Sequence, residues 1–241
     1  MAHNLTQEKG CVMVDINFIK QIATASVDCG MDNTYWYYFE NTLYVEARAE
    51  DRDVYPLDLW SGKVFEIVED IEKAIFGEGC AVIDFSLFNK SDKLVQIDLP
   101  ASFERACPHY VPENCSPGDP LWYVEAGNDE TDTIYLFGSK SLQRINVAKG
   151  NPKFASEDGV LFDKDKKMLV CFPCGRTGTY TVPESVLEIG EDAFSGCDRL
   201  EELIIPNSVT EIGRFAFVGV PHITYHGPAK SDDNWGAKSR N

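Results

Sequence analysis

The chain has 241 residues, of which 44% are apolar and 12% aromatic, a composition that indicates a globular protein and not a disordered one. Its 39 acidic and 22 basic residues give a formal net charge of −17, which disfavours nucleic acid and anionic membrane surfaces as partners. No run approaches the roughly 20 apolar residues of a membrane span, so we expect no membrane insertion. The first 30 residues lack a signal-peptide apolar region. The sequence as it stands therefore predicts a cytoplasmic protein, or one whose leader lies outside it.

Residues 1–82 are predicted to form an N-terminal capping region. Asp15 precedes apolar residues at helical spacing, which indicates a capped helix. The aromatic run 35–39 and the apolar run 43–47 flank a short polar segment and predict a β-hairpin. Between residues 61 and 76 the apolar residues have the spacing of an amphipathic helix. Because an array of repeats needs covered ends, we interpret helix, hairpin and helix as a cap.

Residues 83–229 are predicted to form five coils of a repeat. Two successive units match without a gap at a period of 23 residues, so that Pro183 falls on Pro206 and Phe194 on Phe217. A fixed period of 20–50 residues is typical of a solenoid, in which each unit packs only on its neighbours. The predicted fold is an α+β solenoid with short parallel strands, and with short helical turns whose phenylalanines are buried.

Two insertions interrupt the predicted array. Residues 101–133 are rich in proline and are expected to form a long irregular loop. Residues 148–176 contain two apolar runs on either side of the polar segment 163–167, which predicts a β-hairpin. Residues 230–241 are interpreted as a C-terminal cap or tail.

The repeats resemble a known family. The run Gly150-Asn-Pro-x-Phe154, the continuation to the Ile-Gly-x-x-Ala-Phe of residues 189–194, and the closing His226-Gly-Pro are similar to the bacterial BspA-like leucine-rich repeats. This resemblance implies a leucine-rich-repeat solenoid without enzymatic activity or cofactor. For many members it also implies a cell-surface or secreted protein that adheres to host or matrix proteins. It carries over no defined binding residues.

The cysteines offer a different hypothesis. Cys171-Phe-Pro-Cys174 has the spacing of half a zinc site, and Cys107, His109 and Cys115 in the first insertion are candidates for the remaining ligands. A redox or disulfide pair at Cys171 and Cys174 is an alternative. Because cysteine is among the most buried residue types, packed free thiols are the favoured interpretation, and we assign no metal.

No catalytic residue is assigned. The sequence contains no Gly-x-Ser-x-Gly, phosphate-binding loop, His-Glu-x-x-His or dinucleotide motif, and its carboxylates stand in no recognisable pair. A small enzyme in the N-terminal third stays an alternative that only a cleft with perturbed titratable groups would support.

The favoured function is a non-catalytic module that binds another protein, of unknown identity, through the strand face of the repeats, with an intracellular scaffold as an alternative role. Outward-pointing positions of successive strands are expected to stack into one ribbon. The binding residues predicted in this way are Gln96, Asp98, Gln143, Arg144, Asn146, Thr179, Thr181, Glu201, Glu202, Ile204, Thr224 and Tyr225. A polar ribbon that includes an Ile and a Tyr suits protein recognition, although a merely solvated sheet face has the same pattern.

Overall fold

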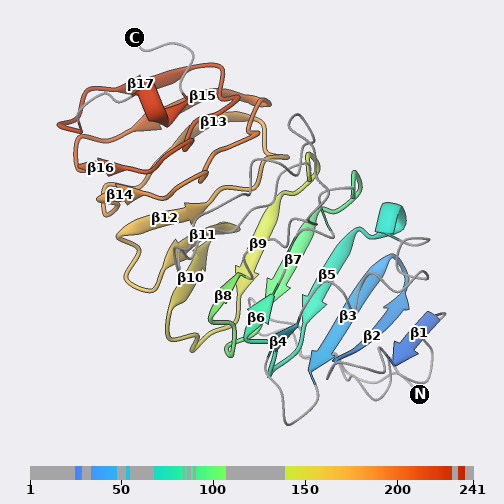
Figure 1. Cartoon of the computed structure of the whole chain (residues 1–241). Helices are drawn as coiled ribbons and strands as arrows, with labels where there is room; N and C mark the ends of the chain where they lie inside the picture. Colours follow the sequence, from blue (N-terminus) through green and yellow to red (C-terminus); the bar gives the residue numbers. More distant parts are fainter. Residues whose placement is uncertain are drawn as a thin grey trace, which may run out of the picture.

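The structure, a computed structural model, consists mostly of short β-strands that follow one another along an elongated array (Figure 1). It describes residues 25–28, 34–47, 53–54, 68–83, 85, 88, 91–106, 139–229 and 233–236. None of these residues is in an α-helix, and helical structure is confined to short 3-10 turns such as η1 (Val68–Asp70) and η4 (Asp233–Trp235). The described part of the chain therefore does not show the helical component of the expected α+β class.

The largest sheet begins antiparallel and continues parallel. Its strands, in spatial order, are β1 (Ala25–Asp28), β2 (Thr34–Phe39), β3 (Thr42–Ala47), β5 (Lys73–Phe76), β7 (Gln96–Leu99) and β9 (Arg144–Val147). The predicted hairpin is confirmed, because β2 and β3 pair across the two-residue turn Glu40–Asn41. Both turn residues have positive φ, 46° and 57°, as the twist of a tight hairpin requires.

The helix expected over residues 61–76 is wrong where the structure describes it, because residues 68–70 form η1 and residues 73–76 form the strand β5. Ala74 and Phe76 are buried while Lys73 and Ile75 are half-buried, which is the alternation of a strand. The backbone of this segment pairs with β3 on one side and β7 on the other. This pairing outweighs the local helical spacing. The helix expected after Asp15 lies outside the described residues.

Three further sheets complete the array. The first contains β4 (Asp53–Val54), β6 (Val82–Ile83) and β8 (Arg105–Ala106), all parallel. The second contains β10 (Phe154–Glu157), β11 (Val160–Asp163), β12 (Met168–Cys171), β14 (Glu188–Ile189) and β16 (Glu211–Ile212). The third contains β13 (Gly178–Thr181), β15 (Leu200–Ile205) and β17 (Ile223–Tyr225), again parallel. Each of the last coils therefore contributes one strand to each of two sheets, as β14 and β15 do.

Both insertions contain strands. In the second, β11 and β12 form the predicted hairpin, and β10 adds a third antiparallel strand in front of it. β12 then pairs in parallel with β14, so the hairpin is continuous with the repeats that follow. In the first insertion β8 occupies residues 105–106, and residues 107–133 lie outside the described part of the chain.

The 23-residue step appears in the strand register at both ends of the array. Lys73 lies opposite Gln96, and Tyr180 lies opposite Leu203. Lys73 and Gln96 lie on either side of residue 82 in the sequence. The 23-residue step therefore spans the position where the sequence suggested a boundary between cap and repeats. The division into a cap, repeats and a tail stays a prediction.

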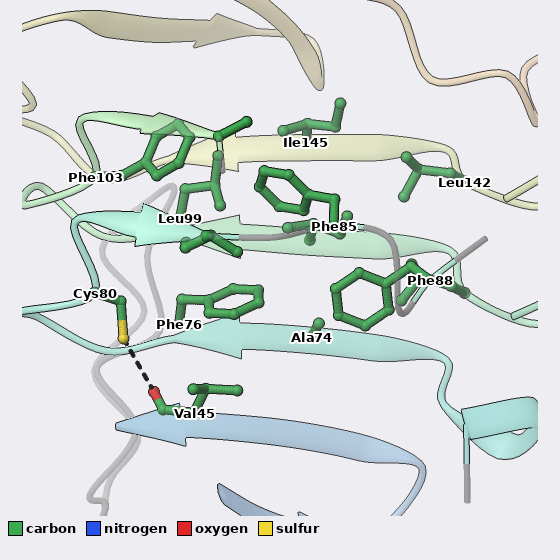
Figure 2. Close-up of a cluster of buried hydrophobic side chains, with 14 of the residues drawn as sticks. Val45, Ala74, Phe76, Cys80, Phe85, Phe88, Leu99, Phe103, Leu142 and Ile145 are labelled. Carbon is green, nitrogen blue, oxygen red and sulfur yellow. Dashed lines mark hydrogen bonds between the residues drawn. The ribbon is translucent and has the colours of Figure 1, made fainter. Parts of the chain in front are cut away.

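Two clusters of buried side chains form the core. The first packs phenylalanines from successive coils edge to face, with the ring centroids of Phe76 and Phe88 6.3 Å apart (Figure 2). The second contains the predicted Phe194 and Phe217, which are 0% and 1% exposed. Residues 191–196 around Phe194 form hydrogen-bonded turns and no helix. Burial of the repeated phenylalanines is thus confirmed, while the helical turn around Phe194 is wrong.

Candidate interaction surface

The outward row of the first sheet is held together by its own side chains. Parallel register places Ile75, Asp98 and Asn146 side by side on neighbouring strands. Lys73 and Gln96 form the preceding pair on this face, two residues earlier on β5 and β7. The Asp98 carboxylate accepts hydrogen bonds from Gln96 Nε2 and Asn146 Nδ2, both at 2.7 Å, and lies 2.8 Å from Lys73 Nζ. The structure therefore brings three predicted binding residues together and joins them through hydrogen bonds to Asp98.

Two more predicted residues lie at the end of this row. Gln143 is exposed, yet its Nε2 donates to the Gly175 carbonyl at 2.6 Å. Arg144 is the exposed member of β9 and lies opposite Gln96. The hairpin turn is built closely against it, because a Cβ on Gly159 would lie 2.9 Å from Arg144 Cγ. Arg144 is exposed, while the other predicted residues on β7 and β9 are half-buried.

The expected continuous ribbon is divided in two. β9 is the last strand of the first sheet, and β13 begins a separate one. The β10–β11 turn lies between them, because Ile145 N donates to the Gly159 carbonyl at 2.8 Å. Arg176 fixes this turn from the other side, since its guanidinium lies 3.0 Å from Asp158 Oδ2. The inserted hairpin therefore interrupts the row of outward side chains.

The face of the β13–β15–β17 sheet is more open. Thr179 and Thr181 are exposed on β13, and Glu201 is exposed on β15. Register places Thr179 beside Glu202, and places Ile204 between Thr181 and Thr224. This face brings together six of the predicted binding residues: Thr179, Thr181, Glu201, Glu202, Ile204 and Thr224. Across the strands, Thr224 Oγ1 donates to Glu202 Oε1 at 2.9 Å.

The outward placement predicted for Tyr225 is wrong. Its register partner is the buried Ile205, and its ring packs against the second core cluster. The Tyr225 hydroxyl donates to the Val209 carbonyl at 2.7 Å and accepts from Ala229 N at 2.9 Å. Tyr225 thus holds the last described coil together and is not part of the outward face.

The two cysteines of the predicted zinc or redox pair are buried in the second half of the array, and the structure holds both as free thiols. The Cys171 and Cys174 sulfurs lie 3.9 Å and 4.0 Å from the Phe172 carbonyl oxygen. Burial raises the pKa of the Cys171 thiol. Among the described residues no group of three or more metal-ligating side chains converges. Cys107, His109 and Cys115 lie outside them, so the zinc hypothesis stays an untested prediction.

Sequence reasoning missed three residues of the outward row. Tyr44, Lys73 and Ile75 lie beside the predicted positions, on β3 and β5. The sequence did hold a signal for Lys73 and Ile75. The pattern Ile71-x-x-Ala74-x-Phe76 recurs 23 residues later as Leu94-x-x-Ile97-x-Leu99. The helical spacing of the same segment obscured it.

Comparison with known proteins confirms the nature of the repeats over residues 170–230. The family model described as "BspA type Leucine rich repeat region (6 copies)" matches residues 170–230. No match is found among curated proteins. No helix among the described residues is long and apolar enough to cross a membrane.

Three solved structures are similar at low identity. A leucine-rich repeat protein from Eubacterium ventriosum is 14% identical, covers 86% of this chain and 74% of its own length, and has a TM-score of 0.37. The pneumococcal vaccine antigen PcpA is 18% identical, with coverages of 85% and 70% and a TM-score of 0.39. A leucine rich cell surface protein from Faecalibacterium prausnitzii is 18% identical, with coverages of 67% and 43% and a TM-score of 0.41.

Proposed function

We propose that this protein, whose residues 170–230 are BspA-type leucine-rich repeats, is a non-catalytic module that binds a protein partner through the outward face of β13–β15–β17. One observation carries the choice of this face. Its strand positions Thr179, Thr181 and Glu201 are exposed, while Gln96, Asp98 and Asn146 of the other sheet hydrogen-bond one another.

A half-buried apolar side chain adds to this proposal. Ile204 lies between Thr181 and Thr224 at the centre of the face. An apolar centre with a polar rim is the usual composition of a protein–protein interface. Adhesion to host or matrix proteins is the role that the repeats suggest first, and an intracellular scaffold is the alternative.

The proposal is tested by affinity capture with the whole chain as bait, run against matrix and host-surface proteins and, in parallel, against cytosol of the source cell. The captured protein is then purified, and its Kd is measured for the native chain and for two variants. Thr181→Arg with Glu201→Arg places new charge and bulk on the face. Glu184→Arg with Ser185→Arg changes the charge by the same +3 at exposed positions in the turn after β13 and serves as the matched control.

We expect the face variant to bind at least about tenfold more weakly, a loss of roughly 1.4 kcal/mol. The control should bind as the native chain does, and both variants should keep its melting temperature. Equal binding by the face variant would rule out this face. The pool that supplies the partner decides between adhesion and an intracellular scaffold.

A further inference from the structure

Two cysteines occupy equivalent positions on neighbouring coils. Cys174 and Cys197 are separated by 23 residues, the same step that places Tyr180 opposite Leu203 in the adjoining parallel ladder. Both lie in the turn that precedes the strand of their coil, before β13 and before β15. At their end of the ladder the register shifts and Gly178 lies opposite Leu200, a step of 22 residues, so Cys197 lies about one residue beyond the position opposite Cys174.

Their sulfur atoms meet around one carbonyl group. Cys174 Sγ lies 4.0 Å and Cys197 Sγ 3.9 Å from the Phe172 carbonyl oxygen. Cys174 Sγ also lies 3.3 Å from the Ser195 carbonyl oxygen, and a Cβ on Gly196 would lie 3.8 Å from it. The residues just before Cys197 thus pack directly on Cys174.

The two thiols also interact with each other. A hydrogen bond from Cys197 to Cys174 is the main cause that lowers the pKa of Cys174, while burial and the same contact raise the pKa of Cys197. Cys174 is 7% exposed and Cys197 is 0% exposed. The pair therefore consists of one thiol that ionises more readily than an ordinary cysteine and one that ionises less readily.

We propose that Cys174 and Cys197 form a disulfide bond when the chain equilibrates with an oxidising thiol–disulfide buffer. Neighbouring strands of a sheet are about 4.8 Å apart, which lies inside the range of roughly 4.4–6.8 Å between the Cα atoms of a disulfide. Cys174 and Cys197 lie on adjacent coils with both sulfurs within 4.0 Å of the Phe172 carbonyl oxygen, so their separation is suited to a bond between the coils. The bond links the segment after the inserted hairpin to the next coil.

The exchange reaction balances with glutathione disulfide as the oxidant. The Cys174 thiolate attacks one sulfur of glutathione disulfide, breaks its S–S bond and releases one glutathione thiolate. The Cys197 sulfur, after losing its proton to solvent, attacks the Cys174 sulfur of the mixed disulfide and displaces the second glutathione thiolate. The two released thiolates take up the two protons, so two protein thiols are oxidised and one glutathione disulfide is reduced.

Cys171, three residues before Cys174, supplies a matched control. It is buried, and its sulfur lies 3.9 Å from the Phe172 carbonyl oxygen. It stands on β12, however, and not at the repeated position of Cys174 and Cys197. The structure thus selects the link between coils over the Cys171–Cys174 pair suggested by the sequence motif.

The test refolds the whole chain in buffers of reduced and oxidised glutathione, blocks free thiols, and maps peptides without reduction. Trypsin places Cys171 and Cys174 on residues 168–176 and Cys197 on residues 177–199. We expect these two peptides to be linked, with fragmentation placing the bond at Cys174. Cys171→Ser should keep the link and Cys174→Ser should remove it. Oxidation should raise the melting temperature of the native chain and of Cys171→Ser by roughly 5–10 °C.

Other outcomes would overturn the proposal. They are a bond between Cys171 and Cys174, a bond from Cys197 to Cys171 in the native chain, or fully reduced Cys174 and Cys197 in a buffer that oxidises surface thiols. Because fragmentation locates the bond in the native chain itself, the result does not depend on whether Cys174→Ser folds.

Discussion

Phe194 stacks on Phe172, with ring centroids 5.0 Å apart and an interplanar angle of 25°. The contact joins the inserted hairpin to the first regular repeat. It continues to Phe217 at 6.1 Å and from there to Trp235 at 6.2 Å. A column of aromatic rings therefore runs through the second half of the array.

Removal of the Phe194 ring should destabilise this column. Phe194 is 0% exposed, so Phe194→Ala leaves a cavity between two rings that cannot fully close. We expect a loss of about 3–5 kcal/mol in the free energy of unfolding, measured by denaturant titration. Val218→Ala, at a position that is 40% exposed, should cost less than about 1 kcal/mol and is the control. Similar losses from the two changes would contradict the packing described here.

Asn151 is a buried polar side chain that serves four backbone groups. Its Nδ2 donates to the carbonyls of Pro100 and Phe103, and its Oδ1 accepts from the backbone amides of Lys153 and Phe154. Asn151→Ala leaves these groups unsatisfied in the interior and should cost roughly 2–4 kcal/mol.

The matched control for Asn151 is Asn146→Ala. That change removes one half-buried hydrogen bond to Asp98 and should cost less than about 1 kcal/mol. Thermal unfolding followed by circular dichroism separates the two. If Asn151→Ala has the same melting temperature as Asn146→Ala, the four hydrogen bonds of Asn151 contribute little to stability.

Gly175 is required by a close approach of two backbones. A Cβ at this position would lie 2.4 Å from the Ser141 carbonyl carbon and 2.6 Å from the Leu142 oxygen. The backbone cannot yield as a flexible side chain does, so Gly175→Ala should destabilise by about 2–3 kcal/mol. Gly178→Ala meets no atom within 4 Å but has a φ of 82°, and should cost only about 1 kcal/mol of backbone strain. The opposite order in measured unfolding free energies would show that residues 141–142 and 175 do not approach as described.

Asp192 should make the protein less stable at alkaline pH. Burial, followed by the neighbouring Glu191, raises its pKa to about 7 from an ordinary 3.8. Between these values the folded state holds a proton that the unfolded state has lost, so this group lowers stability as pH rises through 4 to 7. Its full destabilising effect is present above pH 7 and disappears below about pH 4.

Asn is the suitable replacement at position 192. It removes the charge and tolerates the left-handed backbone there, where φ is 56°. Asp192→Asn should therefore raise the free energy of unfolding at pH 8 by an amount on the order of 1–2 kcal/mol. At pH 4 the same substitution should leave the free energy of unfolding nearly unchanged. Unfolding titrations at the two pH values measure this difference. A stabilisation that is equal at both would show that the Asp192 charge is not responsible.

The inward positions of the repeats were predictable from sequence because they depend on local alternation. Leu200, Leu203 and Ile205 are at most 4% exposed, as their spacing indicated. The hairpin across Glu40–Asn41 and the one around residues 163–167 follow from equally local signals. The segment 71–76 was misread because its apolar residues fit a helix and a strand equally well, and only pairing with β3 and β7 decides between them.

By itself the sequence determined the 23-residue step, the buried phenylalanines and the leucine-rich-repeat character of residues 170–230, since a repeat displays its own period. Only the tertiary structure decided that the inserted hairpin divides the outward ribbon. It likewise decided that the Asp98 carboxylate hydrogen-bonds neighbouring side chains and that Tyr225 turns inward. It also brought Cys197, on the next coil, to the Phe172 carbonyl group that Cys174 approaches. These features depend on which strands pair and where one sheet ends. Such long-range contacts are set by the packing of the whole array and leave no local pattern in the chain.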